Sequence, residues 1–391
     1  MSFATESGPE NVVTIKVVGV GGAGNNVVNR MVKSGTQGIE YVAVNTDKQA
    51  LAVSSADQKI QIGEKLTHGQ GAGSDPDVGK RSAEESRNNI AKSLENADMV
   101  FITAGMGGGT GTGAAPTIAD IAREAGILTV GVVTKPFKFE GKRRMDQAMV
   151  GINELLGKVD SLLIIPNDRL KFATDQKVTL ANAFEIADDV LRQAVVSISD
   201  LIKNTGFINL DFADVTCVMK NAGFAHMGVG RAAGKGKAED AARMAVASPL
   251  METSINGARG VLINITGSED MGLEDVETAA NLVQEAAHPD ANIIFGASFD
   301  PSLDDEIRVS VIATGFDEPG KAQAEAAPAA AAAGMYTAAA TAAAAAPAAA
   351  PAPAAAPAAP AAAPAAAPAA DAAAPAEEDP FDSIFKIFNS K

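Results

Sequence analysis

The first 175 residues alternate between apolar and polar positions in a way that predicts strands separated by helices. Short apolar runs rich in β-branched residues predict buried strands over residues 12–20, 41–45, 99–103, 127–133 and 162–166. Between these runs, apolar residues three and four positions apart predict helices, including one over residues 78–94 and one whose first turn holds Pro116. This order of elements predicts a doubly wound α/β fold built on a parallel sheet.

The second half of the chain has a different pattern. A long amphipathic helix is predicted to begin at Thr179 and to end at the Asn-Thr-Gly of residues 204–206. Strands are then expected over residues 214–219, 260–266, 292–297 and 307–314, and helices over 237–253 and 273–287. The pattern predicts a smaller mixed α/β domain after the long helix. The expected division is residues 11–176 for the first domain, 177–206 for the central helix and 207–316 for the second domain.

After Asp317 the composition changes to alanine and proline and stays so through Pro375. Proline at this density blocks a continuous helix and few bulky apolar residues are present, so residues 317–376 are expected to form a disordered linker. The final segment, residues 377–391, places four apolar residues at helical spacing: Phe381, Ile384, Phe385 and Phe388. Aromatic residues beyond a long spacer favour a docking peptide over a frayed terminus.

Composition limits the classes of function. The net charge of −16 argues against nucleic acid as a partner, because phosphate binding of that kind relies on clustered Lys and Arg. No apolar run approaches the ~20 residues of a membrane span and residues 1–10 lack signal-peptide features, so a cytoplasmic protein without a transmembrane segment is expected. The single cysteine, Cys217, lies in a strand-like run and is expected to be a buried, inert thiol, and the histidines show no metal-ligand spacing.

Three glycine-rich segments lie beside predicted strands or helices: residues 19–24, 69–73 and 105–113. Glycines at such junctions let backbone N–H groups converge, and a helix N-terminus adds a partial positive charge, so each segment predicts an anion site. Neither 19–24 nor 105–113 contains a lysine, so phosphates would be held mainly by backbone dipoles. Three such loops on neighbouring strands fit a ligand with a long phosphate chain.

The first glycine segment also allows another hypothesis. Gly19, Gly21 and Gly24 have the spacing of the dinucleotide fingerprint, and Asp47 follows the next strand about where a ribose-binding acid is expected. A nicotinamide-dependent oxidoreductase is therefore one alternative. A P-loop is disfavoured, because Asn25 and Asn26 stand where Lys and Ser or Thr are needed.

Several spaced motifs together resemble one family. They are residues 107–113 (Gly-Gly-Gly-Thr-Gly-Thr-Gly), 19–26, 136–141, 165–169 and 209–214. The first looks like the tubulin signature, and the set, which spans residues 11–316, resembles the FtsZ family of bacterial tubulin-like cell-division GTPases. The resemblance implies a tubulin-like fold and a GTPase that is activated by polymerisation. It also implies filaments that form the division-ring scaffold at the division site, GTP or GDP as ligand, and Mg²⁺.

The resemblance further implies a set of nucleotide-binding residues. The phosphates would be bound by Gly21, Gly22, Ala23, Gly24, Asn25, Asn26, Gly107, Gly108, Gly109, Thr110 and Gly111, with Gly71, Ala72 and Gly73 facing the γ-phosphate. Glu140 and Arg144 would hold the ribose, and Asn167, Phe184 and Asp188 the guanine base. A carboxylate suits guanine, because it accepts from both N1–H and the 2-amino group, a pair that adenine does not present.

In the same family, Asn209, Asp211 and Asp214 would complete the active site of a neighbouring subunit. If Asp188 touches the base, the rest of its helix carries Asp211 about 20 Å further away at ~1.5 Å per residue, so a head-to-tail neighbour must bring these residues in. A filament that binds GTP without hydrolysing it is a further hypothesis. The C-terminal peptide lacks the family's usual Asp-Ile-Pro-x-Phe-Leu pattern, so the resemblance does not identify its tether or regulator.

Overall fold

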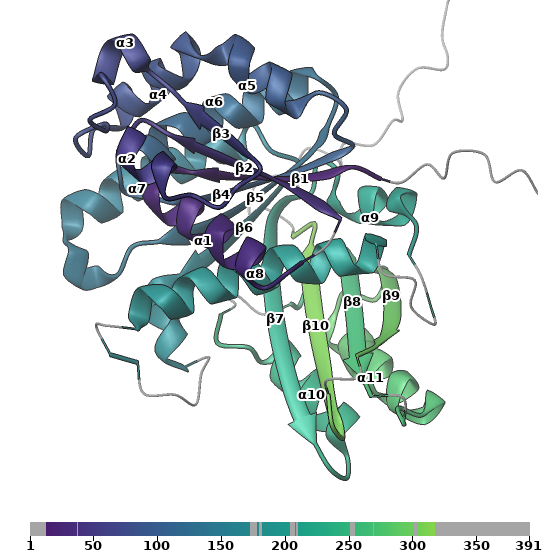
Figure 1. Cartoon of the computed structure of the whole chain (residues 1–391). Helices are drawn as coiled ribbons and strands as arrows, with labels where there is room; N and C mark the ends of the chain where they lie inside the picture. Colours follow the sequence, from purple (N-terminus) through teal and green to yellow (C-terminus); the bar gives the residue numbers. More distant parts are fainter. Residues whose placement is uncertain are drawn as a thin grey trace, which may run out of the picture. The chain divides into compact units, whose positions relative to one another are not determined.

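Among the described residues, ten strands form one sheet (Figure 1). The computed structural model describes residues 13–36, 38–172, 178–179, 182–203, 208, 210–250, 255–268, 270–300 and 303–316. Strand order across the sheet is β3-β2-β1-β4-β5-β6-β7-β10-β8-β9. The first six strands are parallel throughout: β1 (Ile15–Val20), β2 (Ile39–Asn45), β3 (Gln58–Gln61), β4 (Met99–Gly105), β5 (Leu128–Lys135) and β6 (Ser161–Pro166). The predicted parallel α/β fold is confirmed.

Helices cover both faces of this parallel part. On one face lie α1 (Gly21–Lys33) and α8 (Ala183–Lys203); on the other lie α4 (Pro76–Glu85), α5 (Arg87–Leu94), α6 (Thr110–Glu124) and α7 (Lys142–Leu156). The shorter helices are α2 (Lys48–Ala52), α3 (Glu64–Thr67), η1 (Lys138–Glu140) and η2 (Asn167–Phe172). Neighbouring strand residues face opposite cores: Val17 packs towards α1 and α8, and Val18 towards α6. Burial on both faces explains why these strands are continuous apolar runs.

The remaining strands form a mixed part of the same sheet. They are β7 (Gly223–Ala233), β8 (Gly260–Gly267), β9 (Asn292–Phe299) and β10 (Glu306–Thr314), accompanied by α9 (Phe212–Met219), α10 (Lys237–Val246) and α11 (Leu273–Ala286). Strand β10 is antiparallel to both β7 and β8. Helix α8 shares a core with Leu262 and Ile312 of this part as well as with Val17 of β1, whereas α10 and α11 form a separate core on the other face. The long central helix thus packs against both parts.

The segment around Cys217 is a helix, so the strand predicted over residues 214–219 is wrong. Asp211 caps α9 by accepting a hydrogen bond from the Asp214 N–H, at 2.8 Å. The buried residues of α9 are Val215, Val218 and Met219, a helical spacing that a short apolar run does not distinguish from a strand. Cys217 is exposed rather than buried.

Helix α6 begins at Thr110, so Pro116 lies inside it rather than in its first turn. Gly111 and Gly113 are therefore helical, although the pattern places them in a loop. Gly113 is required by packing, because a Cβ atom there would lie 1.9 Å from the Pro76 carbonyl oxygen of α4.

The apolar pattern also does not predict β7, whose glycines weaken the signal. Gly230 lies so close to α10 that a Cβ would be 1.9 Å from the Ala241 oxygen. Two other helices have bounds that differ from the predicted ones. The helix expected over 78–94 is broken at Ser86 into α4 and α5, and α10 ends at Val246.

Candidate functional site

Two of the glycine-rich segments meet at the carboxyl ends of β1 and β4. Gly21 opens α1 with φ of 72°, and a Cβ atom on Gly21 would lie 2.9 Å from the Gly111 nitrogen at the start of α6. The parallel strands are added outward from β1 to β3 on one side and from β4 to β6 on the other, so the strand order reverses between β1 and β4, and α1 and α6 pack on opposite faces of the sheet. Ligands of open α/β sheets bind in the crevice at such a switch point.

The third glycine segment joins the same cluster. A Cβ atom on Gly109 would lie 2.9 Å from Ala72 Cβ and 2.8 Å from the Asp75 nitrogen, so the two loops are in contact. By contrast, a Cβ atom on any of four glycines would meet nothing within 4 Å: Gly22, Gly71, Gly73 and Gly108. The cluster therefore has a close-packed side made by backbone and an open side lined by glycines.

Asn25 fixes the shape of the turn after β1. It is 3% exposed, and in the amide orientation that satisfies both of its ends Nδ2 donates to the oxygens of Gly19 (2.8 Å) and Gly21 (3.1 Å). Its Oδ1 then accepts from Asn45 Nδ2 at 3.0 Å. The Asn25 side chain is committed to the protein, whereas Asn26 is exposed and Ala23 half-buried.

The first turn of α6 carries two hydroxyl groups with different partners. Thr112 is buried and its Oγ1 accepts from the Gly107 N–H at 2.8 Å, which holds the loop before the helix. Thr110 is half-buried, and its Oγ1 lies 2.7 Å from Oγ1 of Thr46. Sequence reasoning missed Thr46, because a single threonine after a strand carries no pattern of its own.

Glu140 and Arg144 lie together beside the glycine loop of β4. Arg144 Nε is 3.1 Å from Glu140 Oε2, and Glu140 Oε1 accepts from the Phe137 N–H at 2.8 Å. Arg144 packs on Gly107, where a Cβ atom would lie 2.7 Å from Arg144 Cγ. A charged pair thus borders the open side of the cluster.

Asn167 and Phe184 are placed at the carboxyl end of β6 and the start of α8. Asn167 is 5% exposed, and its Oδ1 has no hydrogen-bond partner among the described residues. A buried acceptor in this state costs free energy unless a ligand donates to it. The Phe184 ring is 46% exposed and stands edge-on to Phe137, 5.5 Å between centroids, so one face is free for stacking.

Asp188 lies one turn further along α8 and is buried at 7% exposure. Burial raises its pKa from 3.8 to about 6, and Arg30 of α1, with Nε 3.5 Å from Asp188 Oδ2, limits the rise. Asp188, one turn after Phe184 on α8, and Asn167, after β6, thus each supply a buried acceptor. Perturbed titratable groups of this kind are frequent at functional sites.

Asp211 and Asp214 lie at the start of α9, which packs at the amino ends of the parallel strands, opposite to the carboxyl ends where the glycine loops lie. Ser161, the first residue of β6, donates its hydroxyl proton to the Met219 oxygen at 2.6 Å, which fixes α9 at the amino ends of the parallel strands. Asn167 follows the other end of β6, about 20 Å away at ~3.3 Å per strand residue. The structure does not bring these aspartates to the glycine loops of their own chain, and Asn209 lies outside the described residues.

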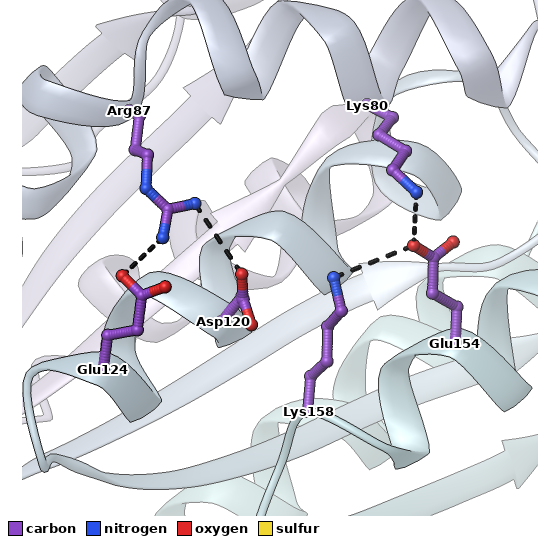
Figure 2. Close-up of polar contacts among 6 residues, drawn as sticks. All are labelled: Lys80, Arg87, Asp120, Glu124, Glu154 and Lys158. Atoms are coloured by element: carbon purple, nitrogen blue, oxygen red, sulfur yellow. Dashed lines mark hydrogen bonds and ion pairs between the residues drawn. The ribbon is translucent and has the colours of Figure 1, made fainter.

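A hollow of about 710 Å³ lies behind the cluster, lined by α4, the first turn of α6 and α7. At its edge Lys80 Nζ is 2.7 Å from Glu154 Oε1, and Lys158 shares that carboxylate (Figure 2). Two further ion pairs, from Arg87 to Asp120 and to Glu124, tie α5 to α6 (Figure 2). These contacts hold the helices that carry the glycine loops.

Other features of the sequence do not form sites. Asp47 caps α2, because its Oδ1 accepts from the N–H groups of Gln49 and Ala50, so the structure gives this carboxylate a local role in the helix. Within the described part of the chain, no group of three or more His, Cys, Asp or Glu residues is arranged to hold a metal ion. A search of the same residues finds no helix with the length and hydropathy needed to cross a bilayer.

Comparisons with known proteins agree with this geometry. Residues 14–175 match the GTPase domain of the Tubulin/FtsZ family, and residues 223–317 match the C-terminal domain of the FtsZ family. An empty FtsZ dimer from M. jannaschii is 46% identical, with a TM-score of 0.75 over 78% of this chain and 88% of that one. A point mutant of FtsZ from the same organism gives 45% identity and a TM-score of 0.75, over 78% and 91%.

A more distant structure shares the fold. CetZ2 from Haloferax volcanii, solved as a GTPγS-bound protofilament, is 21% identical with a TM-score of 0.64 over 80% of this chain and 96% of that one. The identity to FtsZ over most of both chains is high enough to decide the family. The chain belongs to the FtsZ family and carries the GTPase domain shared by FtsZ and tubulin.

Proposed function

We propose that this chain is a self-assembling GTPase of bacterial cytokinesis, which binds GTP at the glycine cluster and hydrolyses it at the contact between subunits. The observation that carries the proposal is the distance between two groups of residues. The glycine loops lie at the carboxyl ends of the parallel strands, and Asp211 and Asp214 lie at the start of the helix at the amino ends. Neither half is a complete site for hydrolysis within one chain.

The residues proposed to contact the base, Asn167, Phe184 and Asp188, favour guanine over adenine. Asp188 and Asn167 Oδ1, which has no partner in the described part of the chain, are both acceptors, and guanine presents donors at N1 and at its 2-amino group. Adenine lacks this pair of donors. Phe184 supplies a ring face for the base, and Glu140 and Arg144 are proposed to hold the ribose.

The phosphates are proposed to rest on backbone N–H groups of the open glycines, from Gly22 and Gly108 to Gly71 and Gly73 at the γ-phosphate. The α6 N-terminus adds its partial positive charge. Mg²⁺ usually takes only one or two carboxylates together with phosphate oxygens, so the lack of a ready-made metal cluster among the described residues is compatible with a cation bound through GTP.

Hydrolysis is proposed to need a head-to-tail neighbour. Asp211 and Asp214 of one subunit would face the γ-phosphate on the next and orient the attacking water, since phosphoryl transfer depends mainly on positioning and electrostatics. A head-to-tail contact that does not close into a ring extends into a filament. Asn209 is proposed to act beside them.

The proposed tail connects the filament to its surroundings. Residues 317–376 as linker and 377–391 as docking peptide lie outside the described residues and stay predictions. Their proposed role is to bind a membrane tether or a regulator at the division site. The proposed domain boundaries at residues 176, 206 and 316 likewise stay predictions.

Specific GTPase activity measured against protein concentration tests this function. Turnover per subunit should be nearly absent below a threshold concentration and rise above it, because the site is completed only by contact. A constant rate down to high dilution would contradict the shared site. GTP binding with filaments but no turnover, unchanged by substitution of Asp211 and Asp214, would instead favour a non-hydrolysing scaffold.

A further inference from the structure

Thr46 contacts two of the three glycine-rich loops. It follows β2 and is 0% exposed. Its Oγ1 lies 2.7 Å from Thr110 Oγ1 at the start of α6. Its carbonyl oxygen accepts from the Gly71 N–H at 3.3 Å and from the Thr67 hydroxyl at 3.3 Å. A single buried residue therefore links α6 to the loop that holds Gly71.

The contact between the two hydroxyl groups has a direction. Among the described residues, the Thr46 hydroxyl makes its hydrogen bond with Thr110 and with no other group. A buried hydroxyl proton without an acceptor costs free energy, so Thr46 must be the donor and Thr110 the acceptor. The Thr110 proton is then left pointing away from Thr46. Thr110 is half-buried, so this proton is available to a ligand.

We propose that Thr46 is a positioning residue that fixes the Thr110 hydroxyl as a donor to a phosphate oxygen of the bound nucleotide. The inference rests on the proposed function. An accepted hydrogen bond polarises the Thr110 hydroxyl and strengthens its donation to an anion. Thr46 thus contributes to phosphate binding through Thr110 and does not itself contact the ligand.

The test is nucleotide binding by a set of variants at protein concentrations below assembly, with GDP and GTPγS as probes. Thr46→Val keeps the shape of the side chain and removes its hydroxyl, and Thr46→Ser keeps the hydroxyl. Thr129→Val is the matched control, because Thr129 is also 0% exposed but lies at the amino end of β5, where its hydroxyl bonds only to the Ile127 oxygen among the described residues. The double variant Thr46→Val with Thr110→Val is compared with Thr110→Val alone.

Thr46→Val should weaken binding of both nucleotides about tenfold, the loss expected for one hydrogen bond to a charged group. Thr46→Ser should stay within about twofold of the parent and Thr129→Val should not change. In the Thr110→Val background, Thr46→Val should cause no further loss, because its effect passes through Thr110. Thermal unfolding without nucleotide shows that each variant is folded.

Three results would overturn the inference: full nucleotide affinity in Thr46→Val, a loss of affinity in Thr46→Ser equal to that in Thr46→Val, or additive losses in the double variant. The second and third results would mean that Thr46 acts only through packing. Failure of the parent protein to bind either guanine nucleotide is a different outcome, since it would remove the proposed function itself.

Discussion

Asp188 and Arg30 face each other across the contact between α8 and α1, with Arg30 Nε 3.5 Å from Asp188 Oδ2. This single cation does not offset the burial of the carboxylate, and the pKa of Asp188 is raised to about 6. Because the folded pKa lies above the unfolded value of 3.8, ionised Asp188 destabilises the folded protein. Its contribution to the free energy of unfolding falls as pH rises from about 4 to about 6 and stays low above that.

Asp188→Asn should therefore stabilise the nucleotide-free protein at pH 7.5 by about 3 kcal/mol, with a smaller gain at pH 4.5, where the carboxyl is largely protonated in the folded state. Urea unfolding at the two pH values measures this. Asp189→Asn is the control, because Asp189 is half-buried and its carboxylate is already partnered by Arg192 at 2.8 Å and Gln193 at 2.6 Å. An equal effect of Asp188→Asn at both pH values would contradict the burial argument. The same variant should lose guanine nucleotide binding.

Much of this site could be predicted from the sequence, because glycine-rich turns after strands are local features. The strand ends and glycines of residues 19–24 and 105–113 suffice to predict an anion site, and parallel topology brings them together. The roles of Glu140, Asn167 and Asp188 follow only from family resemblance. Asn167 and Asp188 are defined by burial, and burial depends on contacts between distant segments.

The incorrect predictions of secondary structure also have their origin in contacts between distant segments. Residues 212–219 form a helix although their apolar run resembles a strand, because Asp211 caps them and β7 occupies the sheet position beside β6. Strand β7 itself contains glycines that a pattern search penalises, yet Gly230 is there to let α10 approach. Tertiary contacts override local propensity in both places.

Mixing two inactive variants should restore GTP hydrolysis if the site is shared. Asp211→Asn together with Asp214→Asn removes the charges, and the amide oxygen that Asp211→Asn introduces can still cap α9. Asp188→Asn removes base recognition but leaves the aspartates intact. In a random copolymer, about a quarter of the junctions would join an intact nucleotide site to intact aspartates.

Turnover in the mixture should exceed the sum of the two separate preparations. A phosphate-release assay at fixed total protein measures it, and each variant alone at that concentration is the control. A mixture no more active than its components, although both variants enter filaments, would show that the two halves do not cooperate across the junction.

Two neighbouring glycines should respond differently to alanine. A Cβ atom on Gly24 would lie 2.3 Å from the Thr103 oxygen, so Gly24→Ala should destabilise the protein by about 1–3 kcal/mol. A Cβ atom on Gly22 meets nothing within 4 Å, so Gly22→Ala should keep the melting temperature and weaken GDP binding instead. Thermal unfolding and GDP titration of both variants separate the effects. Equal melting temperatures would contradict the close packing of Gly24.

Cys217 should react with a thiol reagent in the folded protein, because it is exposed on α9. One equivalent per chain is expected without denaturant, since the chain has a single cysteine. An Ellman titration in buffer and in guanidinium measures the accessible and the total thiol. Reaction only after denaturation would support a buried thiol instead.

The place of β10 in the sheet sets the order in which the chain can fold as it is synthesised. Strands β1 to β6 pair only with one another until β7 joins at β6, so the parallel part can form early. Strand β10 is the last strand of the described chain, yet it lies between β7 and β8 and bonds to both. The second part therefore cannot close until residue 314 has left the ribosome, and a chain ending before Glu306 exposes two unpaired strand edges, which are prone to aggregation.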